Sequence, residues 1–118
     1  MSTTPSIAFF EIATADLPRA RAFYGELFAW KFAEPALPDA AMFDTGGVPG
    51  MLNAVPDHRG GDSTVVYITV DHVQPTYARA LALGATEVIA PRPIPGKGTF
   101  AVFRDRDANR IGIFSTER

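Results

Sequence analysis

The chain has 118 residues, 47% of them hydrophobic and 20% charged, a balance typical of one globular domain with a single core. Its formal charge of −2 argues against nucleic-acid binding, because no basic stripe can displace counterions from phosphates. The absence of cysteine excludes disulfides, thiolate nucleophiles and cysteine metal sites. No apolar run reaches the length of a membrane span and the start MSTTPS has no signal-peptide pattern, so we expect a cytoplasmic protein without a membrane partner.

Residues 6–30 predict a strand, a turn and an amphipathic helix. Ile7, Phe9 and Glu11 alternate with Ala8, Phe10 and Ile12, the period-2 pattern of a strand with two distinct faces. Asp16 is placed to cap the helix, and Pro18 falls in its first turn, where a backbone N–H is not needed. One apolar stripe follows at helical spacing, formed by Leu17, Ala20, Tyr24, Leu27 and Phe28.

The same pattern returns roughly 55 residues later, which indicates two copies of one supersecondary unit. Residues 64–70 alternate as a strand, Asp71 or His72 takes the cap position, and Pro75 takes the early-proline position. A second apolar stripe comprises Val73, Tyr77, Ala80 and Leu81. Gly84 is a suitable helix stop.

Each predicted helix is followed by three predicted strands. In the first half these are residues 30–33, 41–44 and 50–54; in the second they are residues 87–90, 100–104 and 110–115. Residues 91–98 predict a long turn-rich loop, and Asp107 and Asn109 suit a hairpin turn. The fold class is therefore α+β, with one domain over residues 1–118. It contains two βαβββ modules, about 6–54 and 64–116, joined by the linker 55–63.

Three stretches carry a resemblance to a known family: FEIATADLPRARAFYGELFAW, VYITVDHV and FRDRDANRIGIF. The chain resembles the vicinal oxygen chelate superfamily, which includes glyoxalase I, extradiol dioxygenases, fosfomycin-resistance transferases and bleomycin-binding proteins. The resemblance implies that the modules form a curved mixed sheet. One face of that sheet would be a cup for a small ligand, and the helices would cover the convex face.

The positions that carry metal ligands in metal-dependent relatives hold unsuitable residues here. The resemblance places the first-strand ligands at Phe9 and Val65, the last-strand carboxylate of the second module at Gly112, and that of the first module within residues 50–52. None offers the imidazole or carboxylate that such metals need. Of the two histidines, His58 lies in the linker and His72 at a helix start. We therefore expect no metal and no other cofactor.

Strand alternation predicts which residues line the cup. We expect Phe9, Glu11, Met51, Val65, Tyr67 and Phe114 to contact the ligand, and Phe10, Ile12, Ile68 and Ile113 to pack against the helices. If Glu11 is desolvated, it is a candidate catalytic acid, base or ligand anchor. Otherwise it pairs with a nearby arginine or reaches solvent at the rim of the cup. Tyr67 is a second candidate, with a phenol that donates to a ligand oxygen or merely fills space.

Three functions are consistent with these residues, and we favour the first. It is a metal-independent protein that sequesters or senses a small, partly apolar molecule. The second is a glyoxalase-like lyase or isomerase with Glu11 as general base. The third is a metal-dependent enzyme, of glyoxalase or extradiol dioxygenase type, with atypical ligands.

We also expect a homodimer. A module of roughly 55 residues is too small to bury a good core by itself. Its sheet has open edges that invite pairing. The linker allows modules to pair within one chain or to be exchanged between two chains, and the sequence does not distinguish these arrangements.

Overall fold

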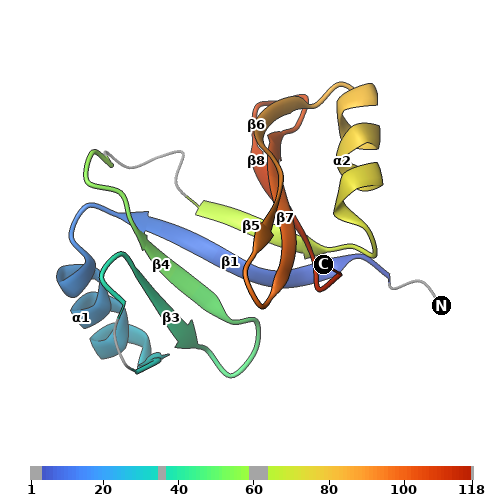
Figure 1. Cartoon of the computed structure of the whole chain (residues 1–118). Helices are drawn as coiled ribbons and strands as arrows, with labels where there is room; N and C mark the ends of the chain where they lie inside the picture. Colours follow the sequence, from blue (N-terminus) through green and yellow to red (C-terminus); the bar gives the residue numbers. More distant parts are fainter. Residues whose placement is uncertain (1–3, 35–36, 59–63, 118) are drawn as a thin grey trace. The chain divides into compact units, whose positions relative to one another are not determined.

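The computed structural model in Figure 1 describes residues 4–34, 37–58 and 64–117. It has an α+β fold in which the pattern βαβββ occurs twice. The elements are β1 (Ser6–Thr14), α1 (Leu17–Phe28), β2 (Lys31–Phe32), β3 (Ala40–Asp44), β4 (Gly50–Ala54), β5 (Thr64–Thr69), α2 (Val73–Ala82), β6 (Thr86–Ile94), β7 (Gly98–Arg104) and β8 (Arg110–Ser115). Neither of these helices is long and apolar enough to cross a membrane.

The chain divides into two compact units, and each is described by itself. The first unit comprises residues 9–64, and the second comprises residues 65–117 together with residues 4–8. One boundary between the units lies between Thr64 and Val65, just after the residues 55–63 that we expected to be a linker. Residues 59–63 of that stretch lie outside the described part of the chain.

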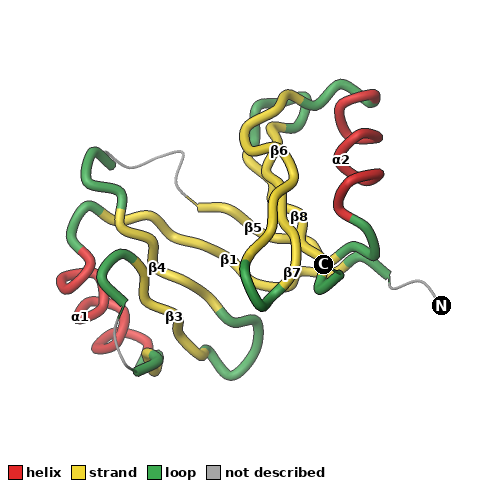
Figure 2. Tube along the Cα trace, viewed as in Figure 1, coloured by secondary structure: helices red, strands yellow, loops and turns green. Residues whose placement is uncertain are grey.

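The first unit is a mixed sheet with α1 packed on one face (Figure 2). Its strands run in the order β2-β3-β4-β1, with β1 and β4 parallel and the other neighbours antiparallel. Leu52 is fully buried in the core beside Phe43, and the α1 residue Tyr24 packs against them. Phe10 and Ile12 join this cluster, which confirms that they face the helix.

Helix α1 begins as predicted but buries less of its stripe. The Asp16 carboxylate accepts a hydrogen bond from the backbone N–H of Arg19 at 3.0 Å, which confirms the predicted cap. Three stripe residues pack toward the core: Leu17, Ala20 and Tyr24. Leu27 and Phe28 are 59% and 53% exposed, so their assignment to the buried stripe was wrong. The sheet covers only a narrow arc of this helix, and these two residues flank that arc.

The second unit repeats this architecture with α2 on one face of its sheet. The strand order is β5-β8-β7-β6, with β5 and β8 parallel and the other neighbours antiparallel. From α2, Val73 and Tyr77 are buried against Ile113, and Ile68 packs on the same cluster. The prediction that both isoleucines face the helices is therefore confirmed. Gly84 has φ +109° just past the helix, as its predicted role as a helix stop requires.

Strand β6 is longer than the sequence predicts. The expected loop at 91–98 is a strand as far as Ile94, followed by a turn at residues 95–97. Pro91 and Pro93 are compatible with pairing because β6 lies at the end of the strand order, where one side of the strand needs no N–H donors. Two register irregularities interrupt its pairing with β7, one on each side of Ile89.

The hairpin between β7 and β8 is held by one carboxylate. Asp105 accepts hydrogen bonds from the backbone N–H groups of Asp107 and Asn109, both at 2.9 Å. These bonds, led by the one from the Asn109 backbone, lower the pKa of Asp105 below its ordinary range. Ala108 takes a left-handed conformation, with φ +69°. The predicted turn is confirmed, although its organising residue is Asp105.

Candidate functional site on the sheet faces opposite the helices

In the first unit, the sheet face opposite α1 carries a row of long side chains. Register pairs Glu11 of β1 with Met51 of β4, and Met51 with Met42 of β3. Glu11 and Met51 are half-buried, and Met42 is 38% exposed. Phe9 lies two residues before Glu11 in β1 and therefore on the same face. The structure thus brings together three of the predicted site residues, Phe9, Glu11 and Met51.

In the second unit, the ring of Tyr67 lies directly over Gly112. These residues are register partners in the parallel pair of β5 and β8. A Cβ atom built on Gly112 would lie 2.3 Å from the Tyr67 ring, well inside van der Waals contact. Glycine is therefore required at this position as long as the ring occupies its place. Tyr67 and Val65 alternate along β5 and are only 5% and 2% exposed, so both side chains are largely enclosed.

A row of residues crosses all four strands of the second unit beside Tyr67. It runs from β5 to β6 as Thr69, Phe114, Phe100 and Arg92. The rings of Phe100 and Tyr67 are 6.4 Å apart between centroids. The exposed guanidinium of Arg92 lies over the Phe100 ring, with its Cζ atom 5.6 Å from the centroid. This is a cation–π geometry. This face therefore offers aromatic surface with a cation at one edge.

Sequence reasoning missed three residues on these faces: Met42, Arg92 and Phe100. Alternation along β3 and β7 is the signal that identifies Met42 and Phe100, since their strand neighbours Phe43 and Ala101 are buried. No comparable signal exists for Arg92. It lies in a stretch with three prolines that predicts a loop, and its register depends on the irregularities in β6.

The residues present do not fit the metal centre of metal-dependent relatives. Phe9 and Val65 are apolar, Met51 offers only a thioether, and the Tyr67 ring fills the place of a side chain at 112. Throughout residues 4–34, 37–58 and 64–117, no three His, Cys, Asp or Glu side chains are grouped to hold a metal ion. The hard divalent metals need oxygen ligands, and zinc needs imidazole, carboxylate or thiolate ligands.

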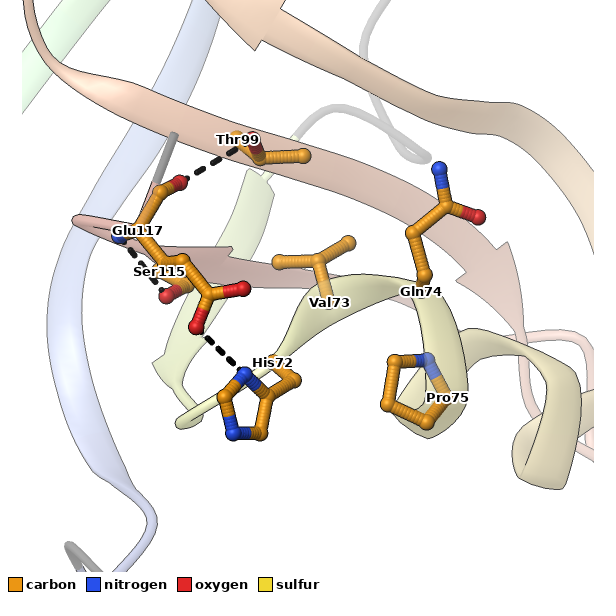
Figure 3. A pocket seen from close by; sticks show the side chains of 7 residues that line it. All are labelled: His72, Val73, Gln74, Pro75, Thr99, Ser115 and Glu117. Atoms are coloured by element: carbon orange, nitrogen blue, oxygen red, sulfur yellow. Dashed lines mark hydrogen bonds and ion pairs between the residues drawn. The ribbon is translucent and has the colours of Figure 1, made fainter.

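A separate hollow of about 250 Å³ lies at the start of α2 (Figure 3). There the Nδ1 atom of His72 contacts the Glu117 carboxylate. The Ser115 hydroxyl donates to the Asp71 carbonyl at 2.8 Å and accepts from the Glu117 backbone N–H at 3.0 Å. Thr99 donates to the Glu117 carbonyl at 3.2 Å. His72 is the N-cap residue of α2, so the predicted cap position is confirmed. Its side chain, however, makes no hydrogen bond to the backbone of the first turn. These contacts fasten the segment after β8 to the helix.

Two ionisable groups with shifted pKa values lie away from the sheet faces. Burial raises the pKa of the Tyr77 hydroxyl, and the nearby Glu87 carboxylate adds to the rise. Tyr77 belongs to the helix-side core, and Asp105 to the hairpin turn. Neither shift therefore marks an acid or base on the candidate site.

Comparisons with known proteins agree on one family. The model of the glyoxalase-like domain matches residues 9–114. No curated protein matches the chain. Similar structures include hypothetical protein BH1468 from Bacillus halodurans C-125, with a TM-score of 0.75, 13% identity and coverage of 98% of this chain and 97% of that one. Methylmalonyl-CoA epimerase from Mycobacterium tuberculosis has a TM-score of 0.71 and 16% identity, and the match covers 92% of this chain and 86% of that one.

The Mn(II)-bound glyoxalase from Novosphingobium aromaticivorans is also similar, with a TM-score of 0.74 and 20% identity. The match covers this whole chain but only 42% of that protein, so the chain spans less than half its length. At these identities the structural likeness shows the fold alone, because one fold hosts many chemistries. The family match, by contrast, extends over nearly the whole chain. The chain therefore belongs to the glyoxalase-like domain family, within the glyoxalase/bleomycin resistance/dioxygenase (vicinal oxygen chelate) superfamily.

Proposed function

We propose that this protein binds a small, partly apolar molecule without a metal ion, and that it sequesters or senses that molecule. In the first unit the proposed ligand contacts are Phe9, Glu11 and Met51, and we add Met42 to them. In the second unit they are Val65, Tyr67 and Phe114, and we add Phe100 and Arg92. We retain the cytoplasmic location as a prediction from the sequence.

The observation that carries this proposal is the Tyr67 ring over Gly112. The family resemblance places a metal-binding carboxylate at position 112. Here a side chain at that position would collide with the ring, so an aromatic surface replaces the ligand. The neighbouring rings of Phe100 and Phe114 are half-buried. Such rings provide a large apolar contact area, and a bound aromatic ring packs against them edge-to-face or offset-stacked. This surface favours a ligand with an apolar body.

The polar groups beside these apolar surfaces explain why we propose a partly apolar ligand. Glu11 places a carboxylate beside Met51, and Arg92 places a guanidinium beside Phe100. A small number of polar groups among apolar side chains is typical of ligand sites, because they fix orientation.

A lyase or isomerase with Glu11 as general base is the second candidate. It is supported by the half-burial of Glu11 beside Met51, which places a carboxylate among apolar side chains, in position to accept a proton from a bound substrate. The isosteric substitution Glu11→Gln separates the two functions. A binding protein keeps its affinity for an uncharged probe, whereas an enzyme loses turnover while still binding substrate.

Binding of the uncharged fluorescent dye N-phenyl-1-naphthylamine tests the proposal. We expect saturable binding to the wild-type protein and a dissociation constant about tenfold higher for Phe114→Ala, because a ring contact of this size contributes about 1.5 kcal/mol or more. Phe28→Ala is the matched control, since Phe28 is an exposed aromatic residue on α1. Circular dichroism establishes that each variant is folded at the titration temperature. Equal weakening by both substitutions, or dye binding that does not saturate, would contradict the proposed site.

A further inference from the structure

All the basic residues in strands β5, β6, β7 and β8 lie on the sheet face opposite α2. They are three arginines: Arg92, Arg104 and Arg110. Arg104 and Arg110 are register partners in β7 and β8. Arg104 follows Phe103, which packs on the core under α2, so alternation places both arginines on the other face. Arg92 pairs with Phe100 on that same face and lies over its ring.

The one acidic residue of these four strands lies on the α2 side. Glu87 of β6 is the register partner of Phe103, and its carboxylate is near Tyr77 in the core under α2. The strand residues of the face opposite α2 therefore include three cations and no carboxylate, although the chain as a whole has a formal charge of −2. A local excess of positive charge on a surface of a negatively charged chain favours a negatively charged ligand there.

Arg92 is the arginine that a ligand reaches most easily. It is exposed, whereas Arg104 and Arg110 are half-buried and Arg104 already donates to the Ala108 carbonyl at 2.8 Å. Arg92 makes no ion pair with any of the described residues; its guanidinium lies over the Phe100 ring. Such stacking uses the flat face of a guanidinium. The N–H groups at its edge can therefore still donate two parallel hydrogen bonds to a carboxylate.

Aromatic surface lies directly beside this cation. Phe100 and Phe114 are register partners on neighbouring strands, and both are half-buried. Neighbouring strands are about 4.8 Å apart, so the two side chains together present a surface about as wide as one bound aromatic ring. The Cζ atom of Arg92 is 5.6 Å from the centroid of Phe100. A ring resting on this surface therefore brings an acid group attached to it within reach of the guanidinium.

We propose that the ligand of this face is a small aromatic carboxylate, with its ring against Phe100 and Phe114 and its carboxylate bound by Arg92. This inference rests on the proposed binding function and specifies the class of ligand. An uncharged aromatic compound leaves the Arg92 N–H groups to water, and a cationic compound is repelled by the three arginines. The face thus selects its ligand by charge as well as by apolar contact.

Equilibrium dialysis with 2-naphthoate and 2-naphthamide, its uncharged near-isostere, tests this inference. The wild type is expected to bind the naphthoate with a dissociation constant about tenfold lower, because charge-assisted hydrogen bonds are stronger than those to a neutral amide. Arg92→Gln is expected to abolish this preference, so that the two compounds bind equally. Arg79→Gln is the matched control and is expected to keep the preference, since Arg79 is an exposed arginine on α2, which packs on the other face. Circular dichroism establishes that each variant is folded.

The two compounds separate this inference from the proposed function on which it rests. Equal dissociation constants in the wild type would overturn the assignment of an aromatic carboxylate but leave a small-molecule site in place. A preference for the naphthoate that survives Arg92→Gln, or one that Arg79→Gln also removes, would overturn it in the same way. If neither compound binds saturably, both the inference and the proposed function are wrong.

Discussion

Replacing Gly98 with alanine is expected to lower the free energy of unfolding by about 3 kcal/mol or more, through backbone strain combined with overpacking. Gly98 begins β7 with φ +150°, and a Cβ atom there would lie 2.0 Å from the backbone carbonyl oxygen of Ser115. Backbone in the paired strand β8 cannot move aside as a flexible side chain can. Urea unfolding followed by circular dichroism measures the loss.

Gly96 in the same hairpin provides the matched control. It has φ +75°, but a Cβ atom there would meet nothing within 4 Å. Gly96→Ala is therefore expected to carry only the left-handed backbone penalty, about 1–2 kcal/mol. Similar losses for Gly96→Ala and Gly98→Ala would show that the close approach of β7 and β8 is not what requires glycine at residue 98. Because β7 carries Phe100, the same approach supports one side of the proposed site.

Gly112→Ala is expected to be destabilising by about 2 kcal/mol in the wild-type background and nearly neutral in the Tyr67→Ala background. The reason is that the three atoms nearest to the new methyl group all belong to the Tyr67 ring, so removing that ring removes the closest collisions. Tyr67→Ala alone is expected to cost about 3 kcal/mol, as is typical of a buried aromatic residue. Unfolding free energies of the wild type, the two single variants and the double variant form a double-mutant cycle, which measures the interaction between the two positions.

A control substitution separates this effect from a general intolerance of alanine for glycine. Gly47 has ordinary φ, and a Cβ atom there would meet only the Thr45 hydroxyl, at 3.8 Å. Gly47→Ala is expected to change the unfolding free energy by less than about 0.5 kcal/mol in either background. Additive losses for Gly112→Ala and Tyr67→Ala would mean that the ring does not occupy the space at position 112.

Much of the fold is predictable because local patterns and tertiary packing agree. The period-2 alternation around Phe10 and Ile68 identifies the helix-facing side of each sheet, and Asp16 caps α1 as its side chain and position suggest. The prediction of a loop at residues 91–98, where β6 extends to Ile94, failed for a different reason. Pro91 and Pro93 signal a loop locally, and only the position of the strand at the end of the strand order makes them compatible with pairing.

The candidate site is less predictable because it depends on which strands become neighbours. Alternation identifies the face of Glu11, but its pairing with Met51 depends on the parallel register of β1 and β4. The position of Arg92 over Phe100 depends on irregular pairing within β6 and β7. The exposed side of α1 was mispredicted at Leu27 for a related reason. Helical spacing identifies an apolar arc but not how much of it the sheet covers.

Titration of chelator-treated protein with N-phenyl-1-naphthylamine, repeated after addition of Mn²⁺, tests metal-independent binding most directly. Our account predicts saturable binding with the same dissociation constant in both conditions, because Phe9, Val65 and Gly112, at the positions where the family resemblance places metal ligands, offer no nitrogen or oxygen side-chain ligand. Dye binding that appears only after Mn²⁺ is added, together with one tightly bound Mn²⁺ per chain, would contradict it.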